Sequence, residues 1–264
     1  MPEGDTVYRT ARNLNAALAG APLTRCDLRV PKFATVDLSG QPVDSVVSRG
    51  KHLLIRVGET SLHSHLKMEG SWHLYKHGSR WRRPAFEARA VLETADWQAV
   101  GFALGMLEVL PRDAEDEAVG HLGPDLLGPD WNPAEALRRL TAEPDRAIGL
   151  ALLDQRNLAG IGNVYRSELC FLRGVLPTRP VAEVDDLPAV VALAKRVLEA
   201  NKNRVERTLT GDTRSGRQDW VYGRAGKPCR RCGTPIRHGL LGDPVQQDRG
   251  ATDRDVYWCP RCQR

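Results

Sequence analysis

The sequence has no run of 18 or more apolar residues and no signal-peptide pattern at its start. A membrane-spanning helix is therefore excluded, and we expect a soluble, cytoplasmic protein without a membrane partner. Internal repeats and low-complexity segments are also absent. Hydrophobic residues still make up 41% of the 264 residues, which excludes global disorder. This length suits one large domain, or two modest domains with a small module.

Basic residues are in small excess, since 38 lysines and arginines stand against 33 acidic residues, for a formal net charge of +5. This balance is compatible with a polyanionic partner but does not require one. The affinity for such a partner would depend on where the arginines lie.

Cysteine is scarce except near the C-terminal end, where four of the six cysteines form two C-x-x-C pairs. Without an export signal, this spacing favours a metal over disulfides. Two pairs complete a closed shell for one structural Zn²⁺, and His238 is a less favoured alternative ligand. The stretch between the pairs is long for one hairpin, so we expect a flexible insertion over residues 241–253. The predicted ligands are Cys229, Cys232, Cys259 and Cys262.

The pattern of apolar and polar residues changes several times along the sequence. Apolar spacing predicts a helix over residues 6–20, with Asp5 as N-cap and Gly20 as the stop. Short apolar runs separated by Gly, Pro, Asp and Ser predict an antiparallel β-sandwich or flattened barrel from about residue 22 to 110. The acidic run 113–117 is interpreted as a solvated loop or linker.

Helical patterns return after residue 124. Four helices are predicted, and Asn132 followed by Pro133 is a cap signal for the first of them. The last stretch is turn-rich and carries the cysteine pairs. We therefore predict a β-rich domain over 1–112, a linker over 113–123, a helical domain over 124–218 and a metal-binding module over 219–264. The predicted helices cover residues 132–142, 147–155, 162–175 and 187–211.

Several short motifs have both a functional and an ordinary interpretation. The glycine-rich turn at 159–163 is either a phosphate cradle with Asn163 as donor or a plain helix–helix turn. Removal of Met1 would leave Pro2 with a free secondary amine beside Glu3, although such a pair also simply precedes a helix. Lys51 follows a glycine at the start of an apolar strand, where lysines are usually solvated.

A second candidate surface is the stretch SLHSHLKMEGSW. His63, His65 and Lys67 alternate in a strand pattern, with Met68 at the following turn. We favour a phosphate-contacting face over solvated strand residues. A metal site would need a third ligand that the sequence does not make evident.

Taken together, these motifs resemble one family, the formamidopyrimidine-DNA glycosylase / endonuclease VIII enzymes of base-excision repair. The resemblance follows the whole chain in order: M-P-E at the start, R-G-K at 49–51, L-D-Q and G-I-G-N within 153–163, V-Y-G-R-A-G-K-P-C before the first cysteine pair, and C-P-x-C-Q at the end. Each motif is weak or moderate by itself, but their joint order is specific.

The resemblance implies an α+β protein with an N-terminal helix and β-sandwich, a helix-two-turn-helix domain and a Cys₄ zinc-finger hairpin. It implies a bifunctional DNA glycosylase and abasic-site lyase. Pro2 would be the Schiff-base amine, Glu3 the general acid/base, and Lys51 an aid to β-elimination. Arg254 matches the finger arginine assigned to the second elimination.

The same resemblance implies how damaged DNA is held. A flipped base leaves a void that Met68, with Lys67 beside it, matches as filler. Asn163 matches the residue that grips a backbone phosphate, and His65 and His121 match DNA-contacting positions. The expected partner is damaged DNA in double-stranded, single-stranded or forked form. We expect a monomer, associated with the nucleoid and carrying one structural Zn²⁺.

The start P-E-G at 2–4 looks like the endonuclease VIII branch, which implies oxidised pyrimidines such as thymine glycol and 5-hydroxycytosine as substrates. The other branch carries an arginine wedge that reads the opposite cytosine, and here the matching stretch is F-A-L-G at 102–105. Thr6 stands where many members have glutamate.

The alternative hypothesis is a non-catalytic DNA-binding protein that keeps the helix-two-turn-helix and the finger. Such a protein has no need of Pro2, Glu3 and Lys51 together. An N-terminal-proline tautomerase would explain Pro2 but not the cysteine pairs, and a zinc-ribbon transcription factor would explain only the tail.

Overall fold

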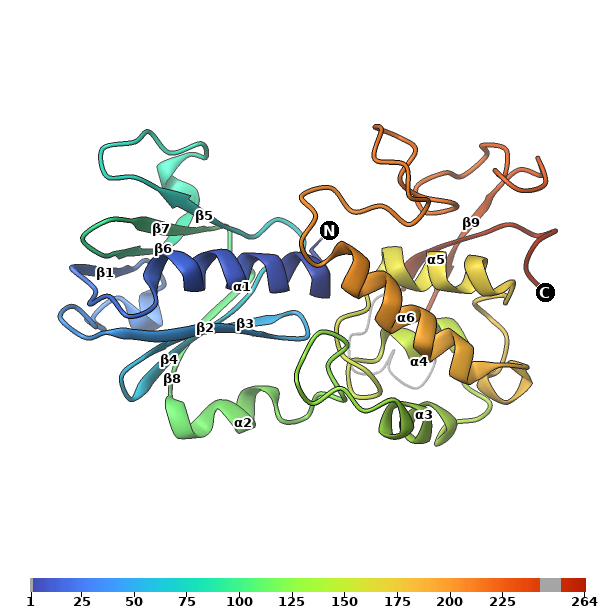
Figure 1. The fold of residues 1–264 in the computed structure, drawn as a ribbon, viewed down its shortest axis with the longest axis horizontal. Helices are drawn as coiled ribbons and strands as arrows, with labels where there is room; N and C mark the ends of the chain where they lie inside the picture. Colours follow the sequence, from blue (N-terminus) through green and yellow to red (C-terminus); the bar gives the residue numbers. More distant parts are fainter. Residues whose placement is uncertain (1, 243–252) are drawn as a thin grey trace. The chain divides into compact units, whose positions relative to one another are not determined.

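The computed structural model describes residues 2–242 and 253–264, and the expected insertion therefore lies almost wholly outside the described residues. The chain forms two compact units, residues 1–121 and 122–264. Each unit is described by itself below (Figure 1). No helix in the described ranges is long and apolar enough to cross a membrane.

Unit 1 begins with helix α1 (Gly4–Leu18), whose buried stripe includes Val7, Ala11 and Leu14. The helix starts two residues before the predicted position, because Glu3 and not Asp5 occupies the N-cap. Asp5 instead lies in the first turn, where its carboxylate accepts a hydrogen bond from the backbone amide of Thr6 at 2.8 Å. Gly20 follows the helix with φ +83°, as its predicted role as stop requires.

Two four-stranded antiparallel sheets follow, which confirms the predicted β-sandwich. One has the order β1-β6-β7-β5 and the other β2-β3-β4-β8. Residues from α1 and from both sheets share one apolar core, and Figure 1 shows α1 running alongside β2. The strands are β1 (Arg25–Leu28), β2 (Val43–Arg49), β3 (His52–Val57), β4 (Thr60–His65), β5 (Ser71–Tyr75), β6 (Ala88–Glu93), β7 (Gln98–Phe102) and β8 (Met106–Pro111).

The acidic run 113–117 is not the solvated loop that its composition suggested. The run leads into a short helix, α2 (Glu115–Val119), which belongs to unit 1. The Glu115 carboxylate accepts hydrogen bonds from Arg56 at 2.6 Å and from Ser61 at 2.5 Å. These partners lie on β3 and β4, so an ion pair with the sheet fixes a segment that looks like a linker in the sequence.

The described residues of unit 2 form four further α-helices and the hairpin of β9 (Arg237–Leu241) and β10 (Arg254–Trp258). The predicted cap is confirmed, since the Asn132 side chain accepts a hydrogen bond from the Glu135 amide at 3.1 Å. The helices are α3 (Pro133–Thr141), α4 (Ile148–Leu153), α5 (Asn163–Arg173) and α6 (Leu187–Asn201), and short 3₁₀ turns lie at Pro31–Phe33, Ala85–Glu87, Arg112–Ala114 and Val181–Glu183.

Helix α6 ends ten residues before the predicted residue 211. The Asn201 side chain accepts a hydrogen bond from the Thr208 amide at 2.8 Å and donates one to the Thr208 carbonyl at 3.1 Å. Val205, which would continue the apolar stripe, is 84% exposed. The side chain of Asn201 thus turns the chain back, and the segment after it forms a loop.

Helix α5 carries the finger module. The fully buried Glu168 carboxylate accepts hydrogen bonds from three consecutive backbone amides, Trp220, Val221 and Tyr222, at 2.8–2.9 Å. Arg166, also fully buried, donates a hydrogen bond to the carbonyl of Asp255 on β10 at 2.5 Å. Both the approach to the finger and its second strand are therefore fixed on one helix.

Candidate functional site

The N-terminal end of α1 lies at the same edge of unit 1 as the turn between β2 and β3. The helix runs antiparallel to β2, because the Gly20 amide donates to the Val43 carbonyl and the Val46 amide donates to the Asn15 side chain. From Asn15 back to Glu3 the helix rises about 18 Å, and from Val46 to Lys51 the strand advances about 17 Å. Glu3 at the start of α1 and Lys51 after β2 therefore lie at about the same distance along the direction of β2.

Lys51 is the second residue of the two-residue turn that joins β2 to β3. Arg49 pairs with His52 across the turn, and Gly50 has φ +57°. A glycine with positive φ at the first turn position matches the strand twist in such hairpins. Lys51 is half-buried there, so the turn holds its ammonium group at the edge of the sheet.

Pro2 and Glu3 occupy this edge with different exposure. Pro2 is half-buried, whereas the Glu3 side chain is fully buried at the N-cap of α1. A carboxyl group withdrawn from water beside a reacting centre is suited to proton transfer. The arrangement thus places a buried carboxyl group directly next to Pro2.

Four histidines gather at the same edge, around the start of β3. The Nδ1 atom of His52 lies 2.8 Å from the Nε2 atom of His63, and the Nδ1 atom of His63 lies 3.2 Å from the Glu108 carboxylate. The His65 and His121 rings lie 5.0 and 6.4 Å from the His52 ring. The predicted DNA-contacting residues His65 and His121 are thereby brought together with two further histidines.

The hydrogen bonds fix the tautomers of the neutral rings. His63 donates from Nδ1 to Glu108, so its Nε2 accepts from the Nδ1–H of His52. The Nδ1 atom of His65 accepts a hydrogen bond from the Lys67 backbone amide at 2.9 Å, which places the ring proton on Nε2. His65 therefore carries a donor that suits an anionic oxygen.

Burial keeps the His52 and His65 rings uncharged near neutral pH. It lowers the pKa of His52 to about 3, with the charges of its neighbouring histidines and Lys67 as further causes. Burial, followed by the positive charges of Lys67 and Lys51, lowers the pKa of His65 to about 4. The His52 Nδ1 and His63 Nε2 atoms contact each other, and among the described residues only the cysteine cluster groups three or more potential metal ligands.

Met68 lies in the turn after β4, as predicted, whereas Lys67 lies in the same turn and does not continue the strand as expected. Lys67 has φ +53°, and a Cβ atom on Gly105 would lie 2.2 Å from the Lys67 Cγ atom, so residue 105 has to be glycine for the turn to pack. Met68 is 59% exposed. A large apolar side chain is thus presented to solvent from a turn whose backbone is fixed.

The F-A-L-G stretch offers no comparable wedge. Phe102 is fully buried in a small cluster on one face of its sheet, and Leu104 is buried in the main core of unit 1. Ala103 between them has φ +45°. The loop thus points its two large side chains inwards, and no arginine lies in it.

In unit 2, Asn163 is the first residue of α5 and is buried behind the glycine-rich turn. The Gln155 side chain shapes this turn, since it accepts a hydrogen bond from the Gly160 amide at 3.0 Å and donates one to the Ile161 carbonyl at 2.9 Å. Gly160 has φ +115°, a conformation that requires glycine. The N-terminal end of α5, which carries the positive end of the helix dipole, therefore lies at this turn.

The four predicted ligands form one cluster whose sulfur atoms all lie within 4.8 Å of one another. The cluster closes the base of the β9–β10 hairpin, and thiolate donors at this spacing fit a tetrahedral Zn²⁺. Arg254 is exposed at the start of β10, opposite Leu241. The finger thus presents this arginine at the end of the hairpin away from the cysteines.

Fold and site define an α+β protein with a β-sandwich unit and a helical unit that carries a cysteine finger. Residues 1–103 match the formamidopyrimidine-DNA glycosylase N-terminal domain, and residues 122–212 match the formamidopyrimidine-DNA glycosylase H2TH domain. The chain therefore belongs to the formamidopyrimidine-DNA glycosylase / endonuclease VIII family.

Named relatives place it in the endonuclease VIII branch. The DNA-(apurinic or apyrimidinic site) lyase Nei2 of Mycolicibacterium smegmatis is 57% identical, over 100% of this chain and 99% of the relative. The probable endonuclease 8 2 of Streptomyces coelicolor is 55% identical, over 100% of this chain and 94% of the relative. The predicted family, branch and enzyme class are confirmed.

Solved structures show the same fold. MutM in complex with DNA that contains carbocyclic 8-oxo-G aligns with a TM-score of 0.79 at 21% identity, over the whole of both chains. The Lactococcus lactis Fpg in complex with abasic-site DNA aligns with a TM-score of 0.78 at 21% identity, again over both whole chains. The predicted α+β architecture is thereby confirmed.

Sequence reasoning missed several residues of the site. His52 was not singled out, although it starts a strand beside the two histidines of β4. Glu108 and Glu168 find their partners on distant segments, and the sequence carries no local signal of either contact. The one available signal for His52 was the pattern of β3 and β4, since His52 begins the first strand and His65 ends the second.

The histidine cluster predicts acid sensitivity. A histidine titrates near pH 6.5 when unfolded, whereas His52 and His65 stay neutral in the folded state down to about pH 4. The contribution of these neutral histidines to stability is therefore fully present above about pH 6.5 and falls as the pH drops. The slope would be about 1.4 kcal/mol per pH unit for a fully buried histidine and is smaller for His52 and His65, which are both partly exposed. Urea unfolding at a series of pH values measures this slope.

The substitution His52→Asn keeps a donor near the Nδ1 position but cannot titrate, so the slope is expected to become shallower. His77→Asn, a histidine outside the cluster, is the matched control. An equal slope in His52→Asn and the wild type would contradict the assignment.

Proposed function

We propose that this protein is a bifunctional DNA glycosylase and abasic-site lyase that removes oxidised pyrimidines from DNA. The observation that carries the proposal is the convergence of Pro2, Glu3 and Lys51 at one edge of unit 1. A family member that only bound DNA would have no use for a buried carboxyl group beside an N-terminal proline. The relative named as a DNA-(apurinic or apyrimidinic site) lyase supports the same activity.

After removal of Met1, the Pro2 nitrogen attacks C1′ of the damaged nucleotide, and the bond from C1′ to the base breaks. Glu3 gives a proton to the sugar ring oxygen as the ring opens. The departing base takes the electron pair of the broken bond and the proton that the Pro2 nitrogen loses, and ring opening then leaves an iminium ion between this nitrogen and C1′. The buried position of Glu3 at the N-cap of α1, one residue from Pro2, supports this role.

The iminium ion makes the C2′ protons acidic, and loss of one of them expels the 3′ phosphate. Lys51, held by its tight turn, is positioned in this scheme to contact phosphate and to assist this β-elimination. Arg254 at the tip of the finger would contact the phosphate near the lesion and assist the second, δ-elimination. The phosphate that leaves takes the electron pair of the broken C–O bond in each elimination.

The remaining predicted residues hold the DNA. Met68 and Lys67 fill the void left by the flipped base, and the exposure of Met68 supports this role. His65 offers its Nε2–H to a phosphate oxygen, with His121 close to the same cluster. Asn163 would bind a backbone phosphate at the positive end of α5.

The substrate class rests on the loop 102–105. Its large side chains are buried, and it has no arginine to read a cytosine opposite the lesion. Oxidised pyrimidines such as thymine glycol and 5-hydroxycytosine are therefore the proposed substrates.

The cysteine cluster is proposed to hold one Zn²⁺ with a structural role. Four thiolates complete a tetrahedral shell and leave no position for a substrate. When bound, the ion supplies folding energy to the finger that carries Arg254.

Borohydride trapping on an oligonucleotide with one abasic site tests the amine. The wild type should form a covalent adduct, and Pro2→Gly should reduce its yield about tenfold or more, because the amine that forms the iminium is displaced from its position. Glu3→Gln should lose base excision by about 10²-fold or more while retaining some trapping. Intact-protein mass checks that Met1 is absent. If a folded, metal-loaded wild type formed no adduct, the lyase mechanism would be rejected and the DNA-binding alternative would remain.

A panel of duplexes with single defined lesions tests the substrate class. Single-turnover excision of thymine glycol and 5-hydroxycytosine is expected to be at least about tenfold faster than excision of 8-oxoguanine opposite cytosine, because no arginine wedge reads the opposite base. Equal or faster release of 8-oxoguanine would reject this specificity.

Metal analysis tests the finger. We expect one zinc per chain in the wild type and loss of zinc, with a lower melting temperature, in Cys259→Ser, since one thiolate of the shell is missing. Cys26→Ser, at a half-buried cysteine of unit 1, is the control and should keep its zinc. Retention of a full equivalent by Cys259→Ser would exclude the four-thiolate site.

A further inference from the structure

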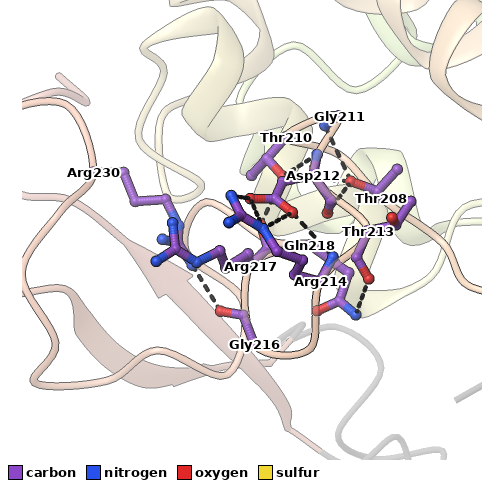
Figure 2. Close-up of polar contacts among 10 residues, drawn as sticks. All are labelled: Thr208, Thr210, Gly211, Asp212, Thr213, Arg214, Gly216, Arg217, Gln218 and Arg230. Carbon is purple, nitrogen blue, oxygen red and sulfur yellow. Dashed lines mark hydrogen bonds and ion pairs between the residues drawn. The ribbon is translucent and has the colours of Figure 1, made fainter.

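The segment Thr208–Gln218, between α6 and the finger, forms a loop closed by its own hydrogen bonds (Figure 2). The Thr208 hydroxyl donates to the Asp212 carbonyl at 2.9 Å and accepts from the Gly211 amide at 3.0 Å. The Thr210 hydroxyl donates to the Arg217 carbonyl at 2.6 Å, and the Leu209 amide donates to the Gln218 carbonyl at 2.8 Å. The backbone of the loop is therefore fixed without help from a ligand.

Both ends of this loop are anchored in unit 2. Asn201 holds Thr208 by two hydrogen bonds, as described for the end of α6. The Trp220 indole N–H donates to the Leu209 carbonyl at 3.0 Å, and the Trp220 amide is one of the three donors to Glu168. The loop is thus connected to both α6 and α5.

The finger holds the loop at its outer side. Arg230 lies between the first two cysteines and donates hydrogen bonds to the Gly216 carbonyl at 2.7 Å and the Asp219 carbonyl at 3.1 Å. Figure 2 shows the Arg230 side chain reaching Gly216. A lysine has a single ammonium group and cannot reproduce this fork, so the position specifically suits arginine.

The charges of the loop are unequal. Asp212 is its one carboxylate, and Arg214 pairs with it at 2.7 Å, which together with further hydrogen bonds lowers the pKa of Asp212 to about 2. Arg217 is exposed, and within the described part of the chain no hydrogen bond or ion pair engages its guanidinium. A rigid loop therefore presents one guanidinium that is still available to an external anion.

We propose that residues 208–218 bind one backbone phosphate of the DNA through Arg217, and that Arg230 is the positioning residue that holds the loop in its binding shape. This inference rests on the proposed function, since it assumes a DNA substrate. A guanidinium on a fixed backbone suits a phosphodiester, because few degrees of freedom are lost when it binds. It also gives the finger a second task, namely to shape a contact outside its own hairpin.

The test measures the affinity of the full-length, zinc-loaded protein for a duplex with a non-cleavable abasic-site analogue at several salt concentrations. Loss of one phosphate contact should reduce the slope of log K against log salt by about 0.9 and weaken binding about tenfold near physiological salt. Arg217→Ala is expected to show both effects. Arg138→Ala, an exposed arginine on α3, is the matched control and should keep the wild-type slope.

Arg230→Lys keeps the charge but loses the fork. It should show the same reduction in slope as Arg217→Ala, with faster hydrogen exchange of the amides at 209–218. The double variant should lose nothing further, because both changes remove one contact. Additive slopes with unchanged amide exchange would make Arg230 a phosphate ligand itself and overturn its positioning role.

An unchanged slope in Arg217→Ala would overturn the phosphate contact. A second outcome would also overturn it. If inorganic phosphate at constant ionic strength shifted the NMR resonance of the Arg217 side chain and DNA did not, the loop would bind free phosphate and not the DNA backbone. Trapping by the wild type separates the two proposals. A normal adduct with an unchanged slope rejects only the loop, whereas a wild type that neither binds nor traps DNA rejects both.

Discussion

The hydrogen bonds to Glu168 are the interaction on which most of unit 2 depends. A fully buried carboxylate is costly unless its oxygens are satisfied, and here three consecutive backbone amides satisfy them. Burial still raises the pKa of Glu168 to about 7 against the lowering effect of those amides. The same helix begins at Asn163 and holds β10 through Arg166, so the proposed phosphate grip and the finger share one rigid support.

In unit 1 the corresponding constraint is the antiparallel register of α1 on β2. Since the helix and the strand reach the same edge, the adjacent residues Pro2 and Glu3 come to the edge that carries Lys51, which is distant from them in the sequence. The histidine cluster adds uncharged donors to an edge that already carries two lysines. The low pKa values of His52 and His65 keep these two rings from adding positive charge to that edge near neutral pH.

The sequence predicted what local patterns determine. The apolar stripe of α1, the Asn132 cap, the short strands and the cysteine spacing all depend on neighbours within a few residues, and each was found where expected. The acidic run was predicted wrongly because distant partners decide it, since Arg56 and Ser61 fix Glu115. Asp5 and the end of α6 were misplaced for local reasons: Glu3 occupies the N-cap of α1, and Thr208 turns the chain after Asn201. Partners of Glu168 and His52 lie on other elements, where propensity and spacing give no information.

The links from α5 to the finger bear on the order in which the protein is made. Glu168 needs residues 220–222, Arg166 needs Asp255, and the Gly174 carbonyl needs the amide of Arg264. A ribosome adds about 5–20 residues per second, so α5 waits several seconds, with two charged side chains lacking their partners, until the finger has been synthesised. Unit 2 is thus expected to complete its folding only after residue 264 has been synthesised, whereas every contact described for unit 1 is available once residue 121 has emerged.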